Sequence, residues 1–355
     1  MRTKIKFAVL LIGIVIVYVT CKPKYPKEKF SFDKLYSFAI QEDVKKIIKS
    51  LKFIPEDSLN SNQIEIKKKY FSRFVTKTEK FDYKTQDTLI INILKIFHNY
   101  WTDVLMKDKS IRNSENINRS LLMSYIKSYT GTKEGITSLN DFNLDLANIL
   151  MKNGYYSRVD RTGNIMDLII WTKQSKETYS INMTDTIVNV PVIFIDNPIT
   201  LGWEGYATFD YYYPGGWTSA DSLYCITKDY DTSSEKFKVS YLTHETQHLI
   251  DSKLYTGYTR WLAEYRAKLA ELSVAEKTVY TLINFFIKDS KNDSHLTHPY
   301  GEYRLISDLS RELFKENFVT DSRRWETISF QDINTASKKL LKQNSLTLTK
   351  KQHSL

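Results

Sequence analysis

Two histidines and a glutamate stand at a spacing that suits metal-dependent hydrolysis. The sequence reads His-Glu-Thr-Gln-His over residues 244–248. On a helix, His244 and His248 lie one turn apart, so their imidazoles converge on one cation. Glu245 lies beside them and reaches a water on that cation, whose pKa zinc lowers to about 7. This HExxH pattern predicts a catalytic zinc site; two exposed histidines on a helix are the alternative interpretation.

A third ligand is expected from the next helix. Gly257 ends one predicted helix and Thr259 begins the next, so a short connection makes the two helices antiparallel neighbours. That packing brings Glu264 toward the two imidazoles. Two histidines and one carboxylate leave a fourth position open for water, which a catalytic zinc ion needs.

Two further carboxylates compete for roles near this site. Glu271 lies two turns after Glu264 on the same predicted helix face, and it is the rival third ligand. Asp251 follows His248 by three residues. It is better placed as an acceptor that orients an imidazole than as a ligand, because metal-bound histidines donate their second ring N–H to such groups.

The segment around the expected third ligand reads Trp-Leu-Ala-Glu-Tyr-Arg-Ala over residues 261–267. HExxH followed by Trp-Leu-x-Glu-x-x-Ala resembles the gluzincin zinc metallopeptidases, especially their M1-like branch, which reads Trp-Leu-Asn-Glu-Gly-Phe-Ala at this place. The resemblance covers residues 233–272. The chain departs at Tyr265, where the branch has glycine, and it lacks the exopeptidase motif GAMEN, so the resemblance does not extend to an aminopeptidase.

This resemblance implies one Zn²⁺ per chain, bound by His244, His248 and Glu264, with Glu245 as the general base. It also implies a zincin-like fold, in which a sheet precedes the active-site helix. The edge strand of such a sheet binds an extended peptide by β-augmentation. Residues 206–209 are the edge strand that the sequence suggests.

The group that stabilises the oxyanion is expected further along the chain, where gluzincins supply a Tyr or a His. Tyr300 and Tyr303 are the leading candidates, because they precede an apolar helical stripe over residues 305–313 that should pack near the site. His298 and Tyr258 are the alternatives.

The elements that must position these residues predict an α+β fold. Residues 34–153 show helical periodicity, which is clearest over 84–106. His98 falls within that apolar stripe and is expected in the core rather than as a ligand. The helical period returns at Thr232, where a capping-box pattern predicts that the HExxH helix starts near residue 233.

Between the two helical parts the sequence reads as strands. A hairpin is predicted around Gly163, and further strands follow at 188–195, 206–213 and 222–227. Aromatic residues crowd this part of the chain. They could pack across strands or line a substrate groove, and both interpretations stay open: Trp203, Tyr206, Phe209, Tyr211, Tyr212, Tyr213 and Trp217.

The N-terminus predicts export. Residues 1–21 combine a basic start, an apolar run over 7–19 and Cys21. A cysteine directly after such a run resembles a bacterial lipoprotein signal, in which Cys21 is lipidated and anchors the chain to a membrane of the cell envelope. The tripeptide before it departs from the lipoprotein pattern, so an ordinary signal peptide or an uncleaved anchor is the alternative. Residues 22–33 read as a tether.

Charge and cysteine content argue against two other classes of protein. The net charge is +10, and three of these charges lie in the first six residues, so removal of that segment leaves +7. The other basic residues are spread among acids, which argues against a nucleic-acid partner. Two cysteines exclude a disulfide scaffold, and Cys225 is expected as a buried, inert thiol.

These observations predict an exported zinc metallopeptidase that hydrolyses peptide or protein substrates. Its catalytic domain is expected over 154–344, with a helical region over 34–153 and a frayed tail over 345–355. One alternative is a catalytically inactive zincin-like lipoprotein that binds peptide or glycan. Another is a zinc hydrolase that acts on a different amide.

Overall fold

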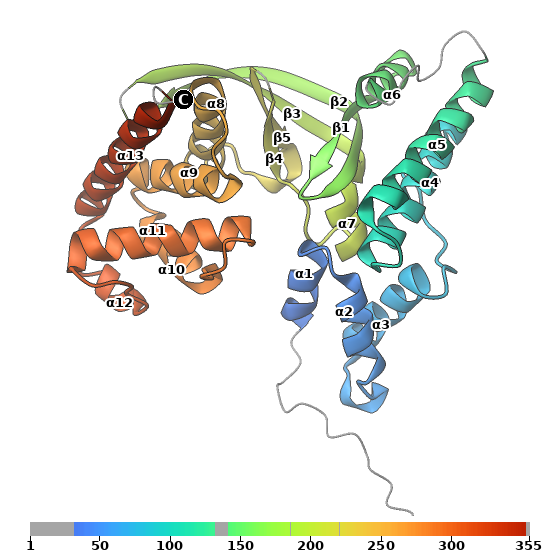
Figure 1. Ribbon diagram of the computed structural model, residues 1–355, viewed down its shortest axis with the longest axis horizontal. Coiled ribbons are helices and arrows are strands. Elements are labelled where there is room, and N and C mark those ends of the chain that lie inside the picture. The colour runs from blue at the N-terminus through green and yellow to red at the C-terminus, as the bar shows by residue number, and fades with distance from the viewer. Residues whose placement is uncertain (1–31, 132–140, 185, 220, 353–355) are drawn as a thin grey trace, which may run out of the picture.

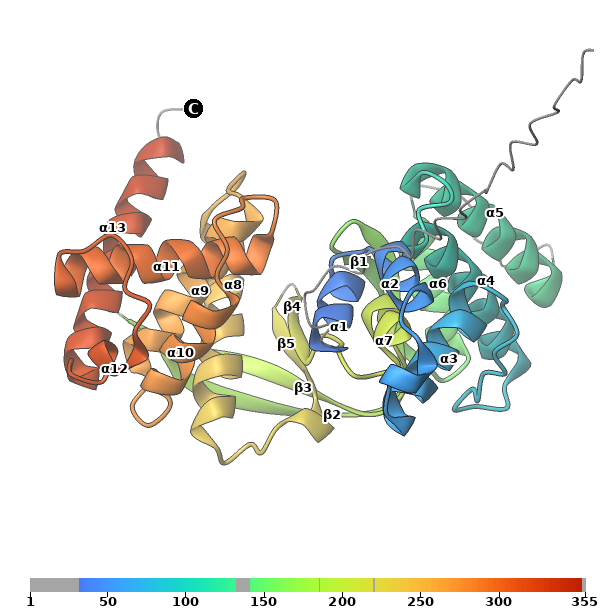
Figure 2. The same ribbon diagram turned by 90° about the horizontal axis from the view of Figure 1, so that it is seen from below.

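The chain has an α+β fold in which one sheet joins two groups of helices (Figure 1). The computed structural model describes residues 32–131, 141–184, 186–219 and 221–352. Long, paired strands run between the two helical groups, which lie at opposite ends of them (Figure 2). The predicted fold class, α+β, is confirmed.

The sheet has five strands in the order β1-β2-β3-β5-β4, and only the β3–β5 pair is parallel. The predicted hairpin around Gly163 is confirmed, because Thr162 pairs with Ile165 across the turn. Strand β4 lies at one edge and β1 at the other. The strands are β1 (Tyr156–Thr162), β2 (Ile165–Asn182), β3 (Ile187–Leu201), β4 (Gly216–Ser219) and β5 (Ser222–Ile226).

The first helical group matches the predicted helical region. The apolar stripe of α4 is buried, as predicted: Leu89, Ile93, Phe97 and Val104 lie in one core. The helices are α1 (Phe32–Ile40), α2 (Val44–Lys52), α3 (Ser61–Phe74), α4 (Thr88–Leu105), α5 (Ile111–Thr130) and α6 (Phe142–Lys152), with a short 3₁₀ turn η1 (Glu56–Ser58).

This core does not stop at residue 153. It continues into the sheet, where the Trp101 indole donates a hydrogen bond to the Met166 carbonyl at 3.0 Å. Trp203 and Tyr206 are buried in the same core, so they serve packing rather than a substrate groove. The helical region and the first part of the sheet therefore fold around one hydrophobic core.

The strand predicted at 206–213 is wrong. Residues Gly202–Thr208 form helix α7, and the chain then turns through Phe209, which has a left-handed backbone. Tyr206 is fixed by the helical core instead of a strand neighbour, because its hydroxyl lies 2.8 Å from Thr102 Oγ1. The suggested edge strand at 206–209 is wrong for the same reason, and β4 takes that position.

The second helical group follows the sheet. Strand β5 leads through a 3₁₀ turn η2 (Thr227–Asp229) into a π-helix, η3 (Phe237–Thr243), which passes directly into α8. Helical structure begins at Glu235, close to the predicted start near residue 233. The remaining helices are α8 (His244–Leu254), α9 (Arg260–Val274), α10 (Val279–Asp289), α11 (Thr297–Phe314), α12 (Ser322–Trp325) and α13 (Phe330–Gln352).

The frayed tail predicted at 345–355 is wrong for its described part. Residues 345–352 continue α13, Leu348 is buried, and Ser345 bonds to α9. The buried thiol predicted at Cys225 is confirmed, and burial raises the pKa of this thiol to about 12.

Several predictions fall on residues outside the described part of the chain. These are the signal segment 1–21, with Cys21, and most of the tether; its last two residues, Phe32 and Asp33, begin α1. Among the helices of the described residues, none has both the length and the apolar character of a membrane span.

Candidate metal centre

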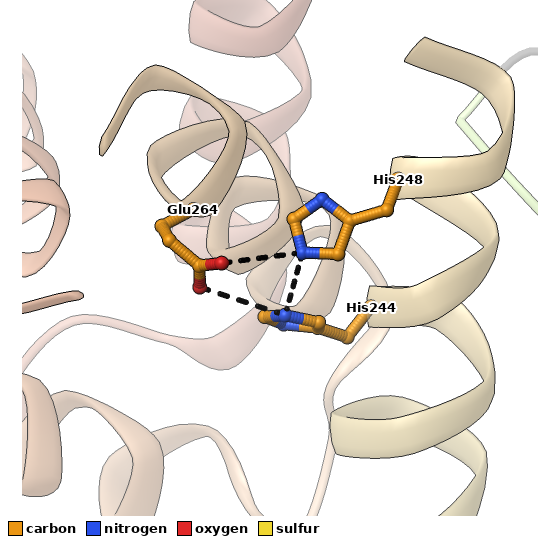
Figure 3. Close-up of side chains that lie close together, drawn as sticks. All are labelled: His244, His248 and Glu264. Atoms are coloured by element: carbon orange, nitrogen blue, oxygen red, sulfur yellow. Dashed lines mark hydrogen bonds and ion pairs between the residues drawn. The ribbon is translucent and has the colours of Figure 1, made fainter. Parts of the chain in front are cut away.

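Helix α8 turns its two histidines toward a single point. Nε2 of His244 lies 3.1 Å from Nε2 of His248, and the rings meet edge to face (Figure 3). Both side chains are mostly buried, with 13% and 20% of their surface exposed. Two lone pairs at this distance repel each other unless a proton or a cation lies between them, so the pair suits a metal ion.

Glu264 of α9 completes the cluster, as predicted. Its Oε1 lies 3.4 Å from His248 Nε2 and its Oε2 lies 3.7 Å from His244 Nε2 (Figure 3). The three ligand atoms all lie within 4.8 Å of one another. Two imidazole nitrogens and one carboxylate oxygen are a donor set that fits a four-coordinate zinc ion with one open position.

A glycine lets the neighbouring helix approach this ligand closely. A Cβ at Gly301 of α11 would lie 3.0 Å from Glu264 Cβ and 3.0 Å from the Trp261 carbonyl oxygen. A side chain there would be a tight fit against these atoms, so the glycine lets α11 pack closely against the turn of α9 that carries Glu264.

The charges of the cluster reinforce one another. Burial disfavours the charged form of His248, but the Glu264 carboxylate outweighs this and raises the pKa of His248 to about 9. Burial also disfavours ionised Glu264, yet His298 and His248 hold the pKa of this carboxyl well below its usual range. The cluster is therefore a carboxylate held among histidines. A divalent cation could take the place of a protonated histidine as the counter-charge of Glu264.

Glu271 does not join the three ligand atoms. Its Oε1 lies 2.6 Å from Nδ1 of His244, the ring nitrogen that faces away from His248. This contact assigns the proton to Nδ1 and leaves the Nε2 lone pair of His244 for a metal ion. The role of orienting an imidazole, expected of Asp251, thus belongs to Glu271.

Asp251 has a different partner, so that expectation is wrong. Both of its carboxylate oxygens accept hydrogen bonds from Arg266, at 2.7 Å and 2.8 Å, and one also accepts from Gln247. Asp251 and Arg266 are both buried and join α8 to α9.

Glu245, the expected general base, points toward the edge of the sheet. The hydroxyl of Thr218 in β4 lies 2.8 Å from Glu245 Oε2 and 2.9 Å from the Glu245 carbonyl oxygen. A hydroxyl that donates to the carboxylate fixes its orientation without neutralising it. Glu245 therefore joins α8, the helix that carries both histidines, to the edge strand β4.

The residues proposed to stabilise the oxyanion lie in different places. Tyr300 and Tyr303 stack on each other, Tyr303 also stacks on Phe318, and Tyr300 packs edge to face on Trp261. None of the contacts seen for these tyrosines among the described residues is with the metal cluster. The contacts of Tyr258 are likewise with the loop between α8 and α9, where it packs on Tyr255.

His298 lies at the cluster itself. Its Nδ1 is 2.8 Å from Glu264 Oε2, and 64% of its side chain is exposed. It is not one of the three residues whose ligand atoms converge. Of the four candidates, the structure brings only His298 into contact with a predicted ligand.

Sequence reasoning missed Thr218, Gly301 and Arg266, which contact the base, the third ligand and the α8–α9 junction. Of these three residues, only Arg266 could have been identified from the sequence, because it lies two residues after Glu264 within the motif Trp-Leu-Ala-Glu-Tyr-Arg-Ala. No family model, curated protein or solved structure matches this chain.

Proposed function

We propose that the chain is a zinc-dependent metallopeptidase of the zincin class. The observation that carries this proposal is the convergence of His244, His248 and Glu264 on one point, with Glu245 beside them. Zinc bound there would polarise a carbonyl oxygen and lower the pKa of a bound water. Three protein ligands with an open position are typical of catalytic rather than structural zinc.

The chain's own residues account for the proton movements of peptide hydrolysis. Glu245 takes a proton from the attacking water and returns it to the leaving nitrogen, held in line by Thr218. Glu271 keeps the His244 tautomer that leaves Nε2 free. His298 is exposed at the cluster and donates a hydrogen bond to the carbonyl oxygen as negative charge develops there.

The position of β4 supports an extended peptide as substrate. This strand pairs with β5 on one side only, and Thr218 holds it against α8. Its free backbone groups offer hydrogen bonds to a peptide laid along the edge, next to the metal cluster. A sheet followed by the HExxH helix also fits a zincin-like domain, as the sequence resemblance implies.

The proposed site of action is the cell envelope, with the chain anchored through a lipid on Cys21. This part of the proposal depends on the basic and apolar character of residues 1–21 alone. Its test is mass spectrometry of the protein purified from bacterial membranes, where a lipidated N-terminal Cys21 is expected. A mature N-terminus at another residue would contradict the anchor.

Metal content and hydrolysis test the main proposal together. We expect about one zinc ion per chain by elemental analysis, and chelator-sensitive cleavage of a peptide library that added zinc restores. Zinc that stays bound in H244A and E264A would contradict the ligand assignment. Peptide binding that chelator does not affect, in protein that binds no zinc, would instead indicate a binding protein.

A further inference from the structure

A buried ion pair joins the two helices that carry the proposed ligands. Asp251 of α8 and Arg266 of α9 expose 0% and 2% of their surface. Arg266 Nε donates to Asp251 Oδ2 at 2.7 Å and Nη2 donates to Oδ1 at 2.8 Å. Asp251 lies three residues after His248, and Arg266 lies two residues after Glu264.

The remaining nitrogen of the guanidinium reaches a third helix. Arg266 Nη1 donates to Asn344 Oδ1 at 2.9 Å and to Ser345 Oγ at 3.1 Å, both in α13. The guanidinium carbon also lies 5.1 Å from the centre of the Tyr255 ring, at the end of α8. Every nitrogen of this side chain is thus engaged, and one planar group fixes α8, α9 and α13 together.

Stability alone does not explain such an arrangement. Removing two charges from water costs several kcal/mol each, and a well-packed apolar pair of similar volume often stabilises a fold equally well. The pair fixes the orientation of α8 relative to α9, because a bidentate contact between a guanidinium and a carboxylate allows one relative orientation. A small rotation of α8 against α9 would break it, and the same rotation would separate His248 from Glu264.

We propose that Arg266 is a positioning residue, which holds α8 and α9 in the one orientation where His244, His248 and Glu264 converge. This inference depends on the proposed zinc site. It concerns only how the chain builds that site, and Arg266 takes no part in the chemistry.

The test replaces the pair by apolar residues in the full chain. The double variant D251L/R266M fills the site with apolar side chains and removes the bidentate contact that fixes the orientation. We expect folding close to wild type and a zinc affinity, measured against a chromophoric chelator, about 10 to 100 times lower. The visible absorption of the cobalt(II)-loaded variant should also change, because it reports coordination geometry.

Two further variants keep the test decisive. R266K retains the positive charge but cannot make the bidentate contact with Asp251. It should therefore fold and bind zinc more weakly than wild type. N334A removes the hydrogen bonds from Asn334 of α13 to the carbonyls of Leu272 in α9 and of Ala275 directly after it. It should lower the free energy of unfolding and leave zinc affinity unchanged.

The failures of the two proposals can be told apart. Wild-type protein that binds no zinc would remove the proposed function, and the inference with it. Wild-type protein that binds zinc, beside folded D251L/R266M and R266K with unchanged affinity and cobalt spectrum, would overturn the positioning role alone. An affinity loss in N334A equal to that in R266K would also overturn it, since any loosening of α13 would then suffice.

Discussion

Oε1 of Glu271 lies 2.6 Å from Nδ1 of His244, on the side of the imidazole that faces away from His248. Glu264, two turns earlier on the same helix, faces the Nε2 atoms of both histidines. Helix α9 therefore presents two carboxylates to the cluster in different roles. In the proposed site, Glu264 would bind the metal ion and Glu271 would orient His244.

This division of roles predicts unequal effects of two substitutions. E264A should weaken zinc binding by more than ~100-fold, because it removes a ligand atom. E271Q should weaken binding by about 10- to 100-fold, because it removes the charge that orients the His244 ring. Chelator competition on the two purified variants measures both values. If E271Q lost more affinity than E264A, the two roles would have to be exchanged.

Glu245 should be needed for turnover and not for metal binding. E245Q keeps the size of the side chain but cannot take a proton, so kcat/KM on a cleaved peptide should fall by at least ~100-fold. Zinc content should stay at the wild-type level. T218V serves as the matched control, because it removes only the hydroxyl beside Glu245 and should cost less activity. Hydrolysis retained in E245Q would contradict the mechanism.

The convergence of His244, His248 and Glu264 was predictable because it depends on local rules. HExxH needs only the geometry of one helix, and Glu264 needs only a short connection to the next helix. The roles of Glu271 and Asp251 could not be predicted from such rules. Spacing along a helix does not give its rotation against a neighbour, and that rotation turns Asp251 toward Arg266 and Glu271 toward His244.

The wrong predictions outside the site also have their cause in tertiary contacts. Aromatic residues favour strands, which predicted a strand at 206–213. Tyr206 is instead held in helix α7 by Thr102 and by the aromatic core around it. The polar composition of 345–355 predicted fraying, but Ser345 bonds to Arg266 and Leu348 is buried against the fold. Both contacts join segments that are far apart in the sequence, so the local sequence could not predict them.

His298 should matter to catalysis more than the two tyrosines do. H298A should lower kcat/KM by about 100-fold, because it removes the exposed donor at the cluster. Y300F and Y303F should stay within about threefold of wild type, since their rings pack on Trp261 and Phe318. Zinc affinity of each variant shows whether H298A acts through the metal. Equal losses in Y303F and H298A would contradict this assignment.

Far from the metal cluster, His98 should make the fold sensitive to acid. Its ring packs 4.4 Å from that of Phe81 and 4.5 Å from that of Tyr206, and its buried Nδ1 has no hydrogen-bond partner among the described residues. Burial, with a smaller effect of Arg73, lowers the pKa of His98 to about 3.

The sign follows from the two states. The unfolded chain binds a proton at His98 near pH 6.5, whereas the folded chain does so only near pH 3. The contribution of His98 to the free energy of unfolding is therefore complete above pH 6.5 and declines as the pH falls toward 3. Between pH 6.5 and 4.5 the loss should reach about 2 to 3 kcal/mol in the free energy of unfolding. H98F should remove it. Denaturant unfolding of wild type, H98F and the exposed-site control H295Q at both pH values measures the difference. A pH dependence of H98F equal to that of wild type would show that His98 takes up its proton in the folded chain.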